Sequence, residues 1–230
     1  MVKNLNKEVR MAVIEYLKKN GVIFLDEANT YLDESVKIGA GTLIYPGVCV
    51  EGNTVIGESC IIHMGCMIKD TEIGNDCVLK YVWSDGAKIG DGVTVGPFVN
   101  LRPNTVIANG CKVGDFVEIK NSNIGDRSKV PHLTYVGDAD VGKDVNIGCG
   151  TVFVNYDGYK KQRSTVGDKV FIGCNTNIVA PVRIDQNAYT AAGTTVTVDV
   201  ESNALAVGRA KQVNIKDWAT RHRQRNIPQK

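Results

Sequence analysis

An aliphatic residue recurs every six positions over most of this 230-residue chain. The repeat runs with small slips from Ile38 to Phe153, and it resumes from Val166 to Val196. Glycine often follows the aliphatic residue, and a small residue usually occupies the fifth position. A period of six fits neither an α-helix nor an alternating strand, whereas hexapeptide repeats are typical of a parallel β-helix. The sequence therefore predicts an all-β fold in which three hexads close one triangular coil, the coils stack about 4.8 Å apart, and glycine relaxes the corners.

The repeat also divides the chain into three parts. In residues 1–24, apolar residues keep helical spacing from Leu5 to Leu17, and Gly21 follows as a helix stop. We expect a short N-terminal α-helix that lies against the first coils. Residues 25–200 form the predicted β-helix domain, and residues 201–230 are expected to be an irregular, basic C-terminal tail.

Charge and cysteine content limit the environment and the partners. A formal net charge of +2 is too small to indicate nucleic-acid binding. The seven cysteines contain no CxxC pair, which argues against a disulfide framework and against a metal site. Four of them fall at the small fifth position of their hexads and are expected to pack inside the coil: Cys60, Cys66, Cys77 and Cys111. No apolar run approaches the roughly 18 residues of a membrane span, so we expect a soluble, cytoplasmic protein without a membrane partner.

Aligning the hexads places His132 at the start of a column. It is the third residue of its hexad, and the equivalent positions in later coils are Cys149, Cys174 and Ala192. The column should span about 14 Å over three coil steps. A histidine with a pKa near 6.5 can accept a proton at neutral pH, so His132 is a candidate general base. A solvated histidine without a catalytic role is the alternative.

Cationic residues are expected on the next face. Arg102 and Lys120 both occupy second positions, one coil apart, so their backbones should lie about 4.8 Å from each other. A bound anion would relieve their repulsion, although simple surface pairing with Glu118 is the alternative. Further polar residues are expected at the same corner, the last three on a loop that interrupts the repeat: Tyr135, Asn155, Tyr156, Lys160, Lys161 and Arg163.

Several longer blocks identify a family. They read LRPN, GDFVEIKNS, KVPHLTYVGDADVG, VNIGCGT, VNYDGYKK and NIVAPV. They resemble the acetyltransferase half of the bifunctional bacterial enzymes, among the hexapeptide acyltransferases, that acetylate glucosamine-1-phosphate and then uridylylate the product. The resemblance covers essentially the whole chain, and the HLTYVGD and NYDG blocks are specific to that family. It implies a left-handed coil, a homotrimer, acetyl-CoA as co-substrate, and a role in UDP-N-acetylglucosamine synthesis for peptidoglycan. The family's nucleotidyltransferase domain, and hence uridylyl transfer, is not expected in this chain.

The resemblance also implies roles for individual residues. His132 corresponds to the catalytic base. The amino-sugar phosphate site falls on Arg102, Lys120, Tyr135, Asn155 and Lys161. The acetyl-CoA site falls on Asn146, Cys149, Cys174, Ala192 and Arg209. Many members of that family carry alanine and serine at the positions of Cys149 and Cys174, a change that leaves backbone contacts intact.

Other functions on the same scaffold remain open at this point. The acceptor sugar comes from the resemblance alone, so an acetyltransferase for another amino sugar is one alternative. A non-catalytic β-helix assembly module is another. A γ-type carbonic anhydrase would need three convergent zinc-binding histidines, whereas His63, His132 and His222 are far apart in the repeat. A flat coil face also needs a second wall to enclose a small ligand, and a neighbouring copy is expected to supply it.

Overall fold

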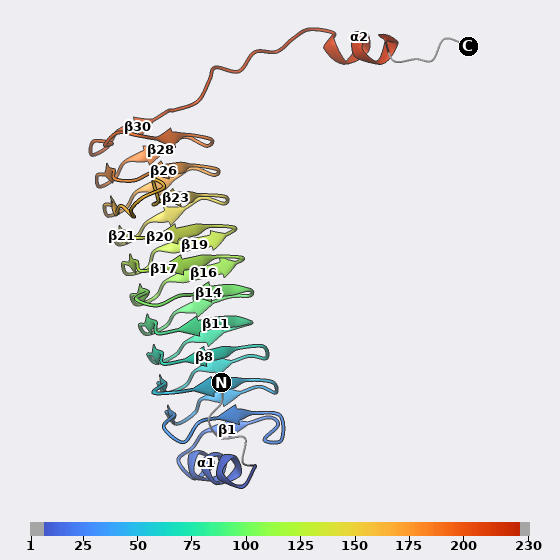
Figure 1. The fold of residues 1–230 in the computed structure, drawn as a ribbon, viewed down its shortest axis with the longest axis vertical. Coiled ribbons are helices and arrows are strands. Elements are labelled where there is room, and N and C mark those ends of the chain that lie inside the picture. The colour runs from blue at the N-terminus through green and yellow to red at the C-terminus, as the bar shows by residue number, and fades with distance from the viewer. Residues whose placement is uncertain (1–6, 226–230) are drawn as a thin grey trace.

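The structure is a computed structural model that describes residues 7–225. It is a parallel β-helix, as the six-residue repeat predicts: thirty short strands form three sheets, and the coils stack into a tall column (Figure 1). Each strand from β1 to β26 pairs with the strand three places further along the chain, and at the end of the column β28 (Tyr189–Thr190) pairs with β30 (Leu205–Ala206). One turn of the coil therefore contributes one strand to each sheet. Neither helix within residues 7–225 has the length and apolar character that a membrane crossing requires.

The strands are short, and each sheet is in order along the column. The eleven-strand sheet contains β1 (Ile23–Phe24), β4 (Leu43–Ile44), β7 (Ile61–Ile62), β10 (Val78–Leu79), β13 (Thr94–Val95), β16 (Lys112–Asp115), β19 (Lys129–His132), β22 (Asn146–Ile147), β25 (Phe171–Ile172), β28 and β30. The ten-strand sheet contains β2 (Tyr31–Leu32), β5 (Cys49–Glu51), β8 (Met67–Lys69), β11 (Val82–Asp85), β14 (Val99–Leu101), β17 (Glu118–Lys120), β20 (Tyr135–Gly137), β23 (Val152–Val154), β26 (Asn177–Val179) and β29 (Thr195–Val196). The nine-strand sheet contains β3 (Lys37–Ile38), β6 (Val55–Ile56), β9 (Glu72–Ile73), β12 (Lys88–Ile89), β15 (Val106–Ile107), β18 (Asn123–Ile124), β21 (Ala139–Val141), β24 (Ser164–Val166) and β27 (Arg183–Ile184).

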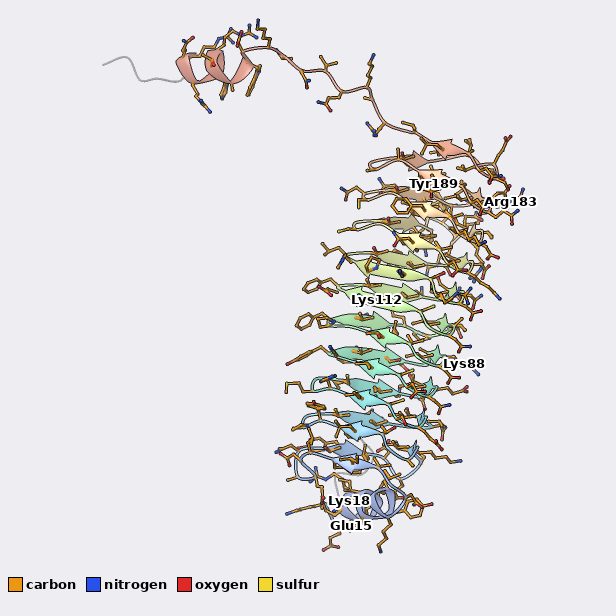
Figure 2. The ribbon with its side chains drawn as sticks, turned by 180° about the vertical axis from the view of Figure 1, so that it is seen from behind. Glu15, Lys18, Lys88, Lys112, Arg183 and Tyr189 are labelled. Carbon is orange, nitrogen blue, oxygen red and sulfur yellow. The ribbon has the colours of Figure 1, made fainter. Side chains whose placement is uncertain are left out.

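The aliphatic residue of each hexad points into the column and stacks on its equivalent in the next coil. Ile44 pairs with Ile62, which pairs with Leu79, and all three are fully buried. Burying one such side chain contributes about 1.5–3 kcal/mol, and the stack repeats along all three sheets. The four cysteines at fifth positions are also buried, as expected. Outside the core, Lys112 and Tyr189 belong to the eleven-strand sheet. Lys88 and Arg183 belong to the nine-strand sheet and lie on the right-hand side of the column in Figure 2.

The repeated glycines have a different role from the one expected. Among those that follow the aliphatic residue in the described part of the chain, only Gly96 has a positive φ, so most of them do not relax the corners. They leave room for the next coil instead: a Cβ on Gly90 would overlap Asn109 Oδ1. That oxygen accepts a hydrogen bond from the backbone N–H of Asp91 at 2.8 Å, and Asp91 Oδ1 accepts one from Asn75 N at 2.7 Å. The glycine therefore permits a side-chain ladder that satisfies corner N–H groups.

Replacing Gly90 with alanine should lower the free energy of unfolding by about 1–3 kcal/mol, the usual cost of overpacking. The added methyl group displaces the Asn109 side chain from Asp91 N–H. Chemical denaturation measures the loss. The matched control is the same substitution in an Asn109→Ala background, where the cost should fall; an equal cost in both backgrounds would show that Asn109 is not the obstacle.

The N-terminal part of the chain covers one end of the column, and the C-terminal part leads away from the other end (Figure 1). Helix α1 (Lys7–Lys19) buries Ile14 and Leu17 and packs against β2, which confirms the N-terminal helix; Leu5 lies outside the described residues. At the other end, β30 adds a strand and α2 (Trp218–Arg225) adds a helix to the segment expected to be irregular. Between them, residues 207–217 contain no helix or strand and lead away from the column (Figure 1). Arg221 and Arg223 therefore lie within α2, and Arg225 is its last residue.

Candidate active site

His132 ends β19, and its exposed side chain starts the column that the hexads predict. The residues that lie three positions before the column members pair with one another in successive coils: Lys129 with Asn146, Asn146 with Phe171, and Phe171 with Tyr189. This register stacks His132, Cys149, Cys174 and Ala192, of which Cys149 is half-buried and the other three are exposed. The corners are joined by hydrogen bonds from Asn175 N to Cys149 O (2.7 Å) and from Gly193 N to Cys174 O (2.8 Å).

The backbone along this column offers unused donors. No hydrogen bond within residues 7–225 uses the N–H groups of Cys149, Cys174 or Ala192. Because those groups lie in successive coils at one corner, they form a row of free donors about 4.8 Å apart. Backbone donors of this kind suit an extended ligand that carries amide or thioester carbonyl oxygens.

The two other residues assigned to this part of the site lie beside the column. Asn146 is half-buried on β22, between Lys129 and Phe171 in register. Arg209 is exposed, and its Cδ lies 3.7 Å from the position that a Cβ on Gly193 would occupy. Arg209 therefore lies next to Ala192, at the far end of its own chain's column.

The cation face is built as predicted, but one of its charges is already paired. Leu101 pairs with Ile119, which places Arg102 and Lys120 in adjacent coils. Arg102 Nη1 donates to Glu118 Oε1 at 2.8 Å, and this contact raises the pKa of the arginine. Glu118 therefore relieves part of the repulsion for which we expected a bound anion. The sequence indicates that Glu118 lies at this face, because it precedes Lys120 by two residues and alternate residues of a strand share one face.

A third cation comes from the loop that interrupts the repeat. The pKa of Lys120 is lowered, first by the neighbouring Lys161 amine and then by burial and Arg102, while Asp138 opposes the shift. Lys161 lies on the loop between β23 and β24, held by an antiparallel bridge to Tyr156. Neither lysine makes an ion pair with a carboxylate within the described part of the chain. The three cations thus converge, and two of them are free to bind an anion.

The loop is held at both ends by contacts that the sequence did not reveal. Arg163, expected on this loop among the cations, forms a two-pronged ion pair with Asp140 (2.6 and 2.5 Å) and also donates to Asn121 O and Ala139 O. At the other end, the buried amide of Asn155 donates to Asp138 Oδ2. Both anchors fix where Lys161 lies relative to Lys120.

Asp138 is the centre of the second anchor and was not among the candidates. It is only 7 % exposed, has a φ of +49°, and accepts from Asn121 Nδ2 at 2.5 Å and from Asn155 Nδ2. Burial opposes its ionisation, but the two amides with Lys120 and Lys161 outweigh burial and hold the pKa of Asp138 below its usual value. Tyr135 lies against the same group, with its hydroxyl 3.4 Å from Asn155 Nδ2.

The lysine pair gives a pH-dependent expectation. Lys161→Met should raise the pKa of Lys120 towards its ordinary value of 10.5, because the largest cause of the shift is removed. In the unaltered protein, affinity for a phosphate should fall as pH rises through the lowered pKa of Lys120, before an ordinary lysine would lose its proton. NMR titration of the lysine side chains measures this pKa. The matched control is Lys88→Met, which removes an exposed partner of Glu72 and should leave the pKa of Lys120 unchanged. An unchanged Lys120 pKa in Lys161→Met would refute the coupling.

The zinc-site alternative depends on how the possible metal ligands are grouped in the described part of the chain. Within residues 7–225, no three His, Cys, Asp or Glu side chains are grouped so as to hold a metal ion. His63 packs against Tyr45 with ring centroids 4.4 Å apart, and it lies four coil steps from His132. His222 stacks on Trp218 in α2. The three histidines are therefore not brought together as the zinc site of a carbonic anhydrase would require.

Known proteins resemble this chain in sequence. Residues 86–121 match the family described as Bacterial transferase hexapeptide (six repeats). The chain is 49% identical over 199 residues to the Bifunctional protein GlmU of Clostridium botulinum (strain Loch Maree / Type A3), covering 86% of this chain and 44% of that protein. It is 50% identical over 210 residues to the Bifunctional protein GlmU of Caldicellulosiruptor saccharolyticus, covering 91% of this chain and 45% of that protein. The chain thus spans about half the length of the curated relatives it matches.

A solved structure supports the fold alone. The UDP-N-acetylglucosamine acyltransferase of Francisella novicida superposes with a TM-score of 0.57 at 16% identity, over 79% of this chain and 66% of that one. The coil is accordingly a left-handed parallel β-helix. By its repeat, its fold and its identity to these relatives, the chain is related to the bacterial hexapeptide transferases and, over most of its own length, to one part of the bifunctional GlmU proteins.

Proposed function

We propose that this chain transfers the acetyl group of acetyl-CoA to the amine of glucosamine-1-phosphate. One observation carries the proposal: Arg102, Lys120 and Lys161 converge on the face that adjoins the His132 column. A base next to a three-cation site suits an acceptor that carries both an amine and a phosphate. The sequence relatives support the same class of reaction.

The cation face is proposed to hold the sugar phosphate. Lys161 is close enough to Lys120 to lower the pKa of Lys120, and a phosphate between the two lysines would replace repulsion with two charge-assisted hydrogen bonds. Arg102 can exchange its contact with Glu118 for a phosphate oxygen, because that ion pair is partly exposed. Tyr135 and Asn155 lie at the inner edge of this face, where they can contact the sugar hydroxyls.

The column is proposed to hold acetyl-CoA. Its free N–H groups at Cys149, Cys174 and Ala192 can donate to carbonyl oxygens of the thioester and of the pantetheine arm. Arg209 lies beside the far end, where the phosphates of coenzyme A would bind a cation. Asn146 supplies a side-chain amide next to the column.

The chemistry follows from this order of groups. His132 takes a proton from the sugar ammonium group or from the amine as it attacks, which makes the nitrogen lone pair available. The nitrogen attacks the thioester carbonyl carbon, and the Cys149 N–H is placed one coil from His132 to stabilise the oxyanion that forms. The C–S bond then breaks, and the coenzyme A thiolate takes a proton. Holding both substrates end to end supplies much of the rate by orientation.

A thiol-release assay tests the proposal. Free coenzyme A should appear from acetyl-CoA only when an acceptor is present, and most rapidly with glucosamine-1-phosphate. Faster release with another amino sugar would assign the chain to that acceptor, and no release with any acceptor would leave a non-catalytic module. We place the reaction in the cytoplasm, in UDP-N-acetylglucosamine synthesis.

A homotrimer is also proposed, because the column is open on one side. Below His132, a ladder of exposed aromatic residues follows the same edge: Tyr81 and Phe98 have ring centroids 5.2 Å apart, and Phe98 and Phe116 5.4 Å. Phe98 and Phe116 are 54% and 57% exposed and both have a φ of +57°, which costs roughly 1–2 kcal/mol each. A second copy packed on the ladder would offset that cost and cover the column. Light scattering should give three times the 24.9 kDa of one chain; a monomer at micromolar concentration would contradict this assembly.

A further inference from the structure

Two of the column residues are cysteines in adjacent coils. Cys149 and Cys174 each lie three residues beyond the paired positions Asn146 and Phe171. Their corners are joined by the 2.7 Å hydrogen bond from Asn175 N to Cys149 O. A Cβ on Gly148, the residue before Cys149, would lie 2.5 Å from Cys174 N, so the two backbones approach closely. The two thiols are thus direct neighbours on one outer edge of the coil.

The spacing suits a disulfide. In-register residues of adjacent coils lie about 4.8 Å apart at Cα, and Cα atoms joined by a disulfide are usually about 4.4–6.8 Å apart. Both residues belong to turns rather than strands, so small side-chain rotations can bring the two sulfur atoms together. Both are reduced in the structure, and Cys174 is exposed while Cys149 is half-buried.

The other cysteines are poor candidates for the same chemistry. Cys60, Cys66, Cys77 and Cys111 are buried inside the column, where a soluble oxidant cannot reach them. Cys49 is half-buried, and burial with the nearby Glu51 raises its pKa to about 12, which disfavours the reactive thiolate. Cys149 and Cys174 are therefore the one pair of adjacent, solvent-accessible thiols within residues 7–225.

We propose that Cys149 and Cys174 form a reversible disulfide when a low-molecular-weight disulfide oxidises them. The exposed Cys174 thiolate attacks one sulfur of the oxidant and expels the first small thiolate. The Cys149 thiolate then attacks Cys174 Sγ and expels the second. The two cysteines lose two electrons and two protons, and the oxidant becomes two small thiols.

The bridge would act on the proposed ligand track. It ties together two coils whose N–H groups line the column, and it draws both sulfur atoms over the corner between them. This consequence rests on the proposed acetyl-CoA site, whereas formation of the bridge does not. An oxidised chain would lose acetyl transfer and regain it on reduction.

Peptide mapping tests the bridge without any activity measurement. The reduced protein is treated with oxidised glutathione, its free thiols are alkylated, and it is digested with trypsin. We expect a cross-link between peptides 144–160 and 170–183, a fall from seven to five free thiols, and reversal by dithiothreitol. Cys149→Ser should instead retain a glutathione adduct on Cys174, and Cys49→Ser should form the cross-link like the unaltered chain. A persistent Cys174 adduct in the presence of Cys149, no modification, or a cross-link between other cysteines would overturn the proposal.

A second arm separates this inference from the proposed function. Saturating acetyl-CoA should slow the cross-link at least several-fold, because the ligand covers the column. If the cross-link forms equally fast with acetyl-CoA present, the thiol pair stands and the proposed ligand track fails. If no cross-link forms even without acetyl-CoA, the thiol pair fails, and the thiol-release assay still decides the function.

Discussion

Replacing His132 with alanine should lower kcat for acetyl transfer to glucosamine-1-phosphate by about 100- to 10,000-fold, the usual contribution of a positioned general base. The side chain is exposed at the end of β19, so its removal leaves no cavity in the core. KM for both substrates should change little, because the cation face and the backbone donors of the column are untouched. Steady-state kinetics with both substrates varied measures the effect.

The chain offers a matched control for this substitution. His63 lies on the same edge of the coil four steps below His132 and packs against Tyr45. His63→Ala should keep kcat within about two-fold, since nothing places it near either proposed substrate. Circular dichroism and unfolding should show that His132→Ala is folded. A folded His132→Ala variant with normal kcat would remove His132 from the mechanism, and an unfolded one would show that its role is structural.

Arg102→Ala should raise KM for glucosamine-1-phosphate by about 10- to 100-fold, the equivalent of one lost hydrogen bond to a charged group. The substitution also leaves Glu118 without its partner at 2.8 Å, and this carboxylate would then repel the phosphate. KM for acetyl-CoA should stay within about two-fold, because the column does not include Arg102. Varying each substrate at saturation of the other separates the two constants.

Arg127 provides the control for a general loss of positive charge. It is an exposed arginine that forms an ion pair with Asp144 at 2.7 Å, at a different corner of the coil. Arg127→Ala should change neither KM. If Arg102→Ala raises both KM values equally, or if Arg127→Ala has the same effect, the phosphate does not bind at the cation face.

The coil architecture could be predicted from the sequence because its information is local and repeated. Each hexad places one aliphatic residue inward, so the period alone fixes three sheets, and counting in steps of three hexads gives the register of Arg102 with Lys120 and of His132 with Cys149. The glycines show the limit of a local argument. Their spacing suggests relaxed corners, but Gly90 is needed because Asn109 of the next coil fills its Cβ position. That reason exists only once the coils are stacked.

The side-chain contacts around the site could not be predicted in the same way. Register gives the position of Glu118 but not its preference for Arg102 over Lys120. The loop departs from the repeat, so nothing in the period indicates that Arg163 turns back to Asp140. The role of the buried Asp138 could not be predicted either, because its hydrogen-bond partners Asn121 and Asn155 belong to other coils. These contacts decide where Lys161 lies, and they depend on tertiary packing.

The most direct test of the central claim is a paired measurement of both products by mass spectrometry, with purified protein, acetyl-CoA and glucosamine-1-phosphate. Free coenzyme A and N-acetylglucosamine-1-phosphate should appear in equal amounts, and no acetyl group should remain on the protein when acetyl-CoA is supplied alone. The same reaction with His132→Ala should give neither product above background on that time scale. Coenzyme A release without the acetylated sugar, or no turnover by the folded protein, would contradict the account.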